Sequence, residues 1–495
     1  MPSVLDRTTA AHILAWPLAA LFLSACGTDY RGCPRELDSS ARAVAQCSTL
    51  TVPMNRVINN GQTVSMPVMR FSPPTPSSKT PLLFLEGGPG ASVINNAAAG
   101  PELAKRFNRD IIYFEQRGTL GASPSLECGS NEDPGTCLNR FANDGIQLSS
   151  FNTIESAADV AQLSTTLGTK FIIWGQSYGT LLAQRVAQKH PDVVEGLVLE
   201  GSVPAGGFSW LLETEPANVV VLKRFSAWLK AKFAQINATP RDINPEQDFP
   251  AAIDELAKYP TLTGLPQGLS PSGAETILRF MRNLPAYAPT FSLWAYNVNH
   301  KVDRSDTQRF TQIAFSALAA AFQSIVSLPD YFAVNCSDQV QFWTDAQLAD
   351  WRAKLTMPTE IADNSLKQMQ QYVAVCKAIL AASPTGYATT EFSSTVLSDV
   401  NTLFLIGDLD TQTPAEWAPT ANFKNARVVH GSCIGHGFFE QEPGLYAVMG
   451  AFLDNPTVTP NDDVVTQFCA KPITQPTLAL RGTPLMPDDD MGPLY

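Results

Sequence analysis

The first half of the chain alternates short apolar segments with longer amphipathic ones. A helix is predicted at residues 154–167, where apolar side chains recur at helical spacing. Strands are predicted at residues 48–52, 63–71, 81–85, 110–114, 171–174 and 193–199. Most of these strands are apolar throughout, which is typical of strands buried on both faces. The pattern therefore predicts an α/β fold, a mostly parallel sheet with helices on both faces.

The pattern changes between about residues 204 and 394, where helical segments follow one another with few strand candidates. Helices are expected at residues 219–236, 274–283, 307–327 and 345–355, and strands resume at 401–406 and 426–430. A helical insertion therefore interrupts the α/β domain. The expected organisation is an export signal (1–25), a first core part (26–204), a helical cap (205–395), a second core part (396–475) and a flexible tail (476–495).

The amino terminus has the pattern of an export signal. Arg7 precedes an apolar stretch at residues 13–23, which is too short to span a bilayer. Leu-Ser-Ala-Cys at residues 23–26 resembles a bacterial lipobox, which implies cleavage before Cys26 and lipidation of its sulfur. By resemblance to Gram-negative lipoproteins, Gly27 rather than Asp in the next position favours the outer membrane. The alternative is an ordinary secretory signal, and both predict a protein exported to the periplasm, outer membrane or medium.

Composition and cysteine content support export of a globular protein. Hydrophobic residues make up 44% of the chain, charged residues 16%, and the net charge is −12. No Lys/Arg-rich run is present, so nucleic-acid binding is not expected. Apart from Cys26 the chain has eight cysteines and no Cys-x-x-Cys motif, which indicates disulfides in an exported protein. The simplest pairing is sequential: 33–47, 128–137, 336–376 and 433–469.

One motif points to nucleophilic chemistry. Residues 175–179 read Gly-Gln-Ser-Tyr-Gly, between a predicted strand and a predicted helix. In this strand–turn–helix setting a serine projects from the end of a sheet as a nucleophile. Glycines on either side of Ser177 allow strand and helix to approach closely. A Gly-x-Ser-x-Gly sequence also occurs in ordinary tight turns, so the other members of a catalytic triad decide the interpretation.

A serine nucleophile needs a base and an orienting acid, which in α/β-hydrolases follow it in the order acid, then histidine. His436 lies in a glycine-flanked loop after the last predicted strand and is the preferred base; His430, at the end of that strand, is the alternative. Asp408 and Asp410 both follow the preceding strand. One is expected to orient the histidine and the other to stabilise the turn.

Stabilising the oxyanion requires backbone N–H groups aimed at the developing charge. One is expected from Tyr178, directly after the nucleophile. The other is expected from the glycine-rich turn at residues 87–90, where Gly88 is the preferred donor.

These motifs together resemble a known family. Leu-Glu-Gly-Gly-Pro-Gly-Ala-Ser at residues 85–92 is similar to the His-Gly-Gly-Pro-Gly loop of prolyl aminopeptidases, and residues 114–118 resemble that family's Asp-Gln-Arg-Gly segment. Residues 157–160, 175–180, 336–338 and 410–414, with Cys469, resemble the tripeptidyl aminopeptidase-like branch. The resemblance implies an α/β-hydrolase fold with a helical cap, serine exopeptidase activity on peptide N-termini, and Asp410 as the acid of the triad.

The family's histidine before the glycine loop is replaced by Glu86, which changes the polarity of that site. A free α-amino group is best bound by carboxylates. The candidates are Glu86, Glu200 at the end of a predicted strand, and Glu213 and Glu215 at the entry to the cap. Each of them could equally be an ordinary surface or capping acid.

The sequence thus predicts an exported serine hydrolase with the triad Ser177, Asp410 and His436. Its expected substrates are peptides with a free N-terminus, from which it removes residues or short peptides. No metal or organic cofactor is implied, and contact with a membrane is expected only through Cys26. The alternatives are an esterase or amidase with the same triad, and a catalytically silent lipoprotein that binds peptides.

Overall fold

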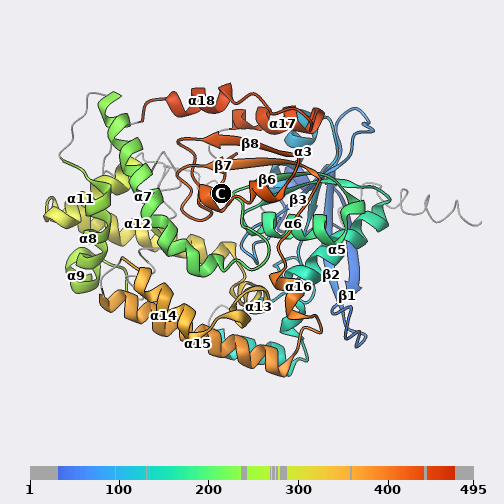
Figure 1. Ribbon diagram of the computed structural model, residues 1–495, viewed down its shortest axis with the longest axis horizontal. Coiled ribbons are helices and arrows are strands. Elements are labelled where there is room, and N and C mark those ends of the chain that lie inside the picture. Colours follow the sequence, from blue (N-terminus) through green and yellow to red (C-terminus); the bar gives the residue numbers. More distant parts are fainter. Residues whose placement is uncertain are drawn as a thin grey trace, which may run out of the picture.

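A central sheet carries the structure. The computed structural model describes residues 32–94, 96–129, 132, 134–235, 242–267, 269, 274, 277–278, 287–356, 359–439 and 443–473 (Figure 1). Within these residues eight strands form one sheet in the order β1-β2-β4-β3-β5-β6-β7-β8. The strands are β1 (Gln46–Pro53), β2 (Thr63–Phe71), β3 (Leu82–Leu85), β4 (Ile111–Phe114), β5 (Phe171–Gln176), β6 (Val194–Glu200), β7 (Asn401–Gly407) and β8 (Ala426–Gly431).

The sheet is antiparallel at one edge and parallel elsewhere. β2 pairs antiparallel with both β1 and β4, and the remaining neighbours are parallel. All residues of β3, β4 and β5 are buried, as expected for apolar strands covered on both faces. The predicted α/β fold with a mostly parallel sheet is confirmed.

Helices cover both faces of the sheet. Apolar side chains of α5 (Thr153–Leu167) and α6 (Tyr178–Lys189) pack in one core cluster with one face of the strands. Those of α3 (Gly100–Phe107), α17 (Tyr446–Asp454) and α18 (Asp463–Ala470) pack in a second cluster on the opposite face. Each sheet face is thus shielded from water, which is the source of the hydrophobic stabilisation of this fold.

The described elements between β6 and β7 are helices, and they lie to the left of and below the sheet in Figure 1. The longer ones are α7 (Trp210–Gln235), α8 (Pro245–Lys258), α11 (Ala288–His300), α12 (Arg304–Ile325), α13 (Leu328–Asp338), α14 (Asp345–Lys354) and α15 (Thr359–Ala382). They build two apolar clusters of their own. The helix expected at 219–236 begins earlier, at Trp210, with Pro216 inside it. The helix expected at 274–283 lies largely outside the described residues, and the exact domain bounds stay a prediction.

Four disulfides join described cysteines, in the predicted sequential pairing: Cys33–Cys47, Cys128–Cys137, Cys336–Cys376 and Cys433–Cys469. None of the described helices has the length and apolar character needed to cross a bilayer. The predicted signal at residues 1–25, the lipidation site Cys26 and the tail at 476–495 lie outside the described residues.

Candidate active site

Ser177 occupies a strained turn between β5 and α6. Its backbone has φ 54° and ψ −124°, a conformation that residues other than glycine rarely adopt. The turn leaves no room for side chains at its two glycines. A Cβ at Gly179 would lie 2.1 Å from the Leu85 carbonyl oxygen, and one at Gly175 would lie 2.3 Å from the Gly179 carbonyl oxygen. The Ser177 N–H donates to the Glu200 carbonyl (2.9 Å), which fixes the turn against β6. This is the strand–turn–helix geometry expected from the sequence.

Asp410 and His436 form a buried pair in the loops after β7 and β8. His436 Nδ1 lies 3.0 Å from Asp410 Oδ2, and the side chains are 16% and 1% exposed. The other carboxylate oxygen of Asp410 accepts the N–H groups of Gln412 and Thr413, both at 2.8 Å. Thr413 Oγ1 donates to Asp410 Oδ2 and lies 3.2 Å from His436 Nδ1. The carboxylate is therefore held rigidly at the distance needed to orient the imidazole.

The alternative residues form a second, exposed pair. His430 Nδ1 lies 3.2 Å from Asp408 Oδ1, and their side chains are 56% and 32% exposed. Each aspartate after β7 thus has its own histidine. An exposed pair is solvated and carries little energy, so this one has the character of a surface contact.

Gly201 links the buried pair to the turn that carries the nucleophile. Gly201 follows Glu200, which pairs in the sheet with Gln176, the residue before Ser177. A Cβ at Gly201 would lie 3.3 Å from both Asp410 Oδ2 and His436 Cε1. The carboxyl ends of β5, β7 and β8, with Gly201 at the end of β6, therefore bring the serine, the carboxylate and the imidazole to the same side of the sheet, where ligands of parallel α/β sheets bind.

The glycine loop after β3 lies against the nucleophile. A Cβ at Gly87 would be 2.9 Å from Ser177 Cβ and 3.5 Å from Ser177 Oγ, so only a bare backbone fits. Gly88 has φ 104°, which a side chain would disfavour. Tyr178 begins α6, so its N–H lies at the positive end of the helix dipole. The glycine loop thus meets Ser177 at Gly87, with Gly88 next along the chain, and Tyr178 follows Ser177 directly; the role of Gly88 and Tyr178 as oxyanion donors stays a prediction.

Glu200 and Glu86 are buried behind this site, at 1% and 8% exposure. The Glu200 carboxylate accepts the indole N–H of Trp174 (2.8 Å), the Gln176 amide (3.4 Å) and the Phe439 N–H (3.1 Å). It therefore joins the residue before the nucleophile to the loop that carries His436. This contact was not predicted from the sequence, because a backbone N–H group such as that of Phe439 is present in almost every residue and leaves no pattern in the sequence.

Glu86 is bound by its own loop. Its Oε1 accepts the Gly87 N–H (2.8 Å), and its Oε2 accepts the side-chain amide of Asn96. Asn96, Gln176 and Glu200 line a cavity of about 50 Å³ between the sheet and α3. This volume is enough for a water molecule and too small for an amino-acid side chain of ordinary size.

Glu213 and Glu215 are half-buried near the start of α7. This helix passes directly over the acid loop, because the Asn218 side-chain amide donates to the Thr411 carbonyl (3.0 Å). The structure therefore brings the amino-terminal part of α7 to the same edge of the sheet as the triad.

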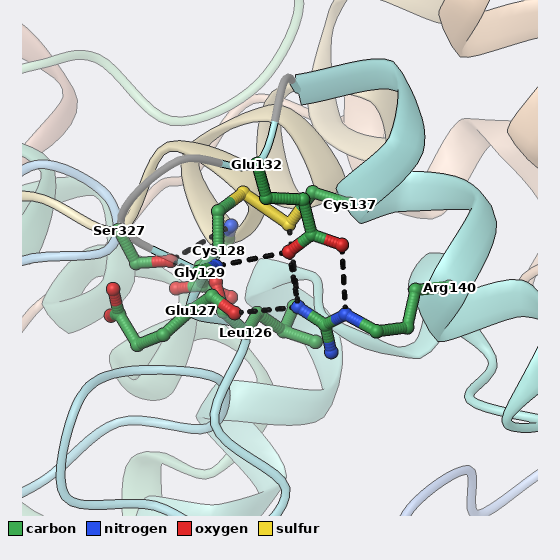
Figure 2. The surroundings of a disulfide bond; sticks show 9 residues. Leu126, Glu127, Cys128, Gly129, Glu132, Cys137, Arg140 and Ser327 are labelled. Atoms are coloured by element: carbon green, nitrogen blue, oxygen red, sulfur yellow. Dashed lines mark hydrogen bonds and ion pairs between the residues drawn. A yellow bond between two sulfur atoms is a disulfide. The ribbon is translucent and has the colours of Figure 1, made fainter.

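A further group of potential metal ligands has a structural explanation. Cys128, Glu132 and Cys137 lie close together, but the two sulfur atoms are bonded to each other. Figure 2 shows Arg140 bound to the Glu132 carboxylate, with Nη2 to Oε2 at 2.9 Å. The cluster is thus a disulfide with the Glu132–Arg140 ion pair beside it.

Comparisons with known proteins show which families the chain is similar to. A model of the alpha/beta hydrolase fold matches residues 80–255, and a model of the TAP-like proteins matches residues 363–465. Serine protease Hip1 of Mycobacterium tuberculosis is 27% identical over 191 residues, which are 32% of this chain and 36% of that protein. A proline iminopeptidase of Neisseria gonorrhoeae is 35% identical over 125 residues, 24% of this chain and 32% of that protein. The chain spans about a third of the length of these relatives.

Among solved structures, a proline iminopeptidase from Mycobacterium smegmatis is 16% identical, with a TM-score of 0.34. That alignment covers 83% of this chain and 99% of the other.

Proposed function

Since the chain belongs to the α/β-hydrolases of the prolyl aminopeptidase and TAP-like peptidase family, we propose that it is a serine exopeptidase. In this proposal it removes residues or short peptides from the free N-terminus of peptides. The observation that carries the chemistry is Ser177 in its strained turn, at the sheet edge where His436 pairs with the buried Asp410. The observation that supports peptides as substrates is the similarity to relatives named as peptidases.

Each residue of the site has a defined role in the proposed reaction. Ser177 Oγ attacks the scissile carbonyl carbon while His436 Nε2 takes the hydroxyl proton. Asp410 accepts a hydrogen bond from the Nδ1–H group of His436, which fixes the tautomer that leaves Nε2 free to act as base. The N–H groups of Tyr178 and Gly88 bind the oxyanion. His436 then protonates the leaving amine, and a water molecule releases the acyl group by the same steps.

Recognition of the substrate ammonium group is assigned to α7. The carboxylate oxygens of Glu200 and Glu86 already accept hydrogen bonds from their own surroundings, next to a cavity of about 50 Å³. Glu213 and Glu215 are half-buried on a helix that crosses the acid loop, so a carboxylate there can meet an ammonium group close to the triad. A partly desolvated carboxylate binds a cation more strongly than an exposed one.

We place the protein outside the cytoplasm. Four disulfides among described residues are typical of exported proteins, because thiols are kept reduced in the cytosol. The lipobox at residues 23–26 makes Cys26 the proposed point of attachment to a membrane.

Aminoacyl-naphthylamides with free and N-acetylated termini test the exopeptidase proposal. The expected result is hydrolysis of the free form and at least a hundredfold lower kcat/KM for the acetylated one, with Ser177→Ala inactive on both. Equal turnover of both forms would contradict the proposal and favour an esterase or amidase with the same triad. Glu213→Gln and Glu215→Gln should raise KM for the free substrate. If neither variant raises KM, the assignment of ammonium recognition to α7 is wrong.

A further inference from the structure

Helix α13 of the insertion contacts both elements of the proposed oxyanion hole. At its start, the Ser327 N–H donates to the Gly90 carbonyl (2.9 Å), and Val326 forms a β-bridge with Ala91. Ser327 Oγ also donates to the Leu126 carbonyl (2.6 Å), a contact shown in Figure 2. The glycine loop therefore cannot move without the start of α13.

The other end of α13 reaches the residue after the nucleophile. Asp338, the last residue of the helix, accepts the N–H of Thr153 at Oδ1 (3.3 Å) and the hydroxyl of Thr153 at Oδ2. Thr153 Oγ1 in turn lies 2.7 Å from the phenolic oxygen of Tyr178. Tyr178 and Thr153 are 3% and 1% exposed. A continuous chain of hydrogen bonds thus runs from the insertion to Tyr178.

The direction of this chain follows from the number of protons. A threonine hydroxyl has one proton, and Thr153 gives it to the Asp338 carboxylate, so the Tyr178 hydroxyl must donate to Thr153. Every donor then has an acceptor. If position 338 becomes a donor, Thr153 must turn its proton towards Tyr178, and the Tyr178 hydroxyl loses its acceptor in a buried site. An unsatisfied buried donor is costly, so Tyr178 is expected to shift.

We propose that Asp338 is a positioning residue for the oxyanion hole, acting on Tyr178 through the Thr153 hydroxyl. The Tyr178 side chain anchors the first residue of α6, whose N–H is aimed at the oxyanion. Together with Ser327 at the other end, Asp338 makes α13 the element that sets the distance between the two oxyanion donors. The inference rests on the proposed serine hydrolase chemistry, but not on the choice of a peptide as substrate.

Burial of Asp338 makes the arrangement sensitive to pH. Burial raises the pKa of this carboxyl to about 6, and the hydrogen bonds from Thr153 and the positive charge of Arg185 on α6 partly offset this rise. Burial raises the pKa of the Tyr178 phenol well above its usual range. The carboxylates of Asp338 and Asp330 raise it further, while the hydrogen bond with Thr153 and the charge of Arg117 lower it. Tyr178 therefore stays a neutral donor, while Asp338 changes from acceptor to donor as the pH falls through about 6.

The test compares Asp338→Asn with the wild type on p-nitrophenyl acetate, an ester that needs no ammonium recognition. At pH 8, kcat should fall about tenfold with KM within twofold, since misplacing an oxyanion donor costs less than the 10²–10³-fold of losing one. The ratio of wild-type to variant kcat should approach one at pH 5, because Asp338 is then protonated in the wild type. Protonation of His436 affects both proteins and cancels in the ratio.

Further variants distinguish a positioning role of Asp338 from a role in folding. Thr153→Val should lower kcat as much as Asp338→Asn, the double variant should be no worse than either single one, and Thr153→Ser should keep wild-type activity. Asp350→Asn, at an exposed acid of the neighbouring α14, is the matched control and should change nothing. A kcat ratio that is constant with pH, an effect confined to KM, or additive losses would each overturn the proposal. An enzyme that hydrolyses the ester but no free-amine naphthylamide would contradict the exopeptidase function and leave this comparison intact.

Discussion

Replacement of Asp410 by asparagine removes one charge from the buried triad while keeping its shape. The carboxylate accepts bonds from the N–H groups of Gln412 and Thr413 on one oxygen, and from Thr413 Oγ1 and His436 Nδ1 on the other. An amide cannot satisfy both sets, because its NH2 group faces a donor whichever way it turns. The change therefore tests what the carboxylate does for the imidazole.

The size of the effect follows from the tautomer of His436. With the asparagine NH2 turned towards Nδ1, the imidazole must present a lone pair there and carry its proton on Nε2, where it can no longer accept the proton of Ser177. With the NH2 turned the other way, two buried N–H groups lose their acceptor, at a cost of about 1–3 kcal/mol. By analogy with other serine triads, kcat should fall about 10⁴-fold, which is about 5 kcal/mol of transition-state stabilisation.

The assay is kcat on p-nitrophenyl acetate at pH 8, with the melting temperature as a check on folding. Asp408→Asn is the matched control, since Asp408 lies in the same loop and pairs with the exposed His430. The control should retain activity within twofold. A loss below tenfold in folded Asp410→Asn, or a larger loss in Asp408→Asn, would refute the assignment of the acid.

Three other substitutions test separate parts of the structure. Gly201→Ala should lower kcat at least tenfold, because Gly201 has φ 62° and the new Cβ would lie 2.7 Å from Thr413 Oγ1, which binds the triad acid. Asp159→Ala should lower the free energy of unfolding in urea by about 3–5 kcal/mol, since it leaves the fully buried Arg117 without its bidentate partner. Burial raises the pKa of Asp330 well above its usual range, so its contribution to stability is present at low pH and is lost as the pH rises through the raised pKa. Asp330→Asn should therefore raise the melting temperature more at pH 8 than at pH 4, and an equal shift at both would contradict this reasoning.

The strands could be predicted because buried parallel strands leave a strong pattern in the sequence. Residues 401–406 and 426–430 were expected as strands, and β7 and β8 extend each by one residue. The insertion was harder to predict. α7 includes Pro216, which usually marks a helix start.

The triad could be proposed from residue types and their order, because histidines are few and only His436 lies in a glycine-flanked loop after the last strand. The supporting contacts could not. Glu200 meets the Phe439 N–H across 239 positions of sequence, and Asp338 meets Thr153 across 185. Such contacts depend on the packing of distant segments, and the residue types involved are common in surface positions.

The nucleophile can be identified directly by labelling the protein with a fluorophosphonate and locating the adduct by mass spectrometry. We predict one adduct, on Ser177, formed rapidly in the wild type and at least a hundredfold more slowly in His436→Ala. Labelling of another residue, or labelling of Ser177 at the same rate without His436, would contradict the account.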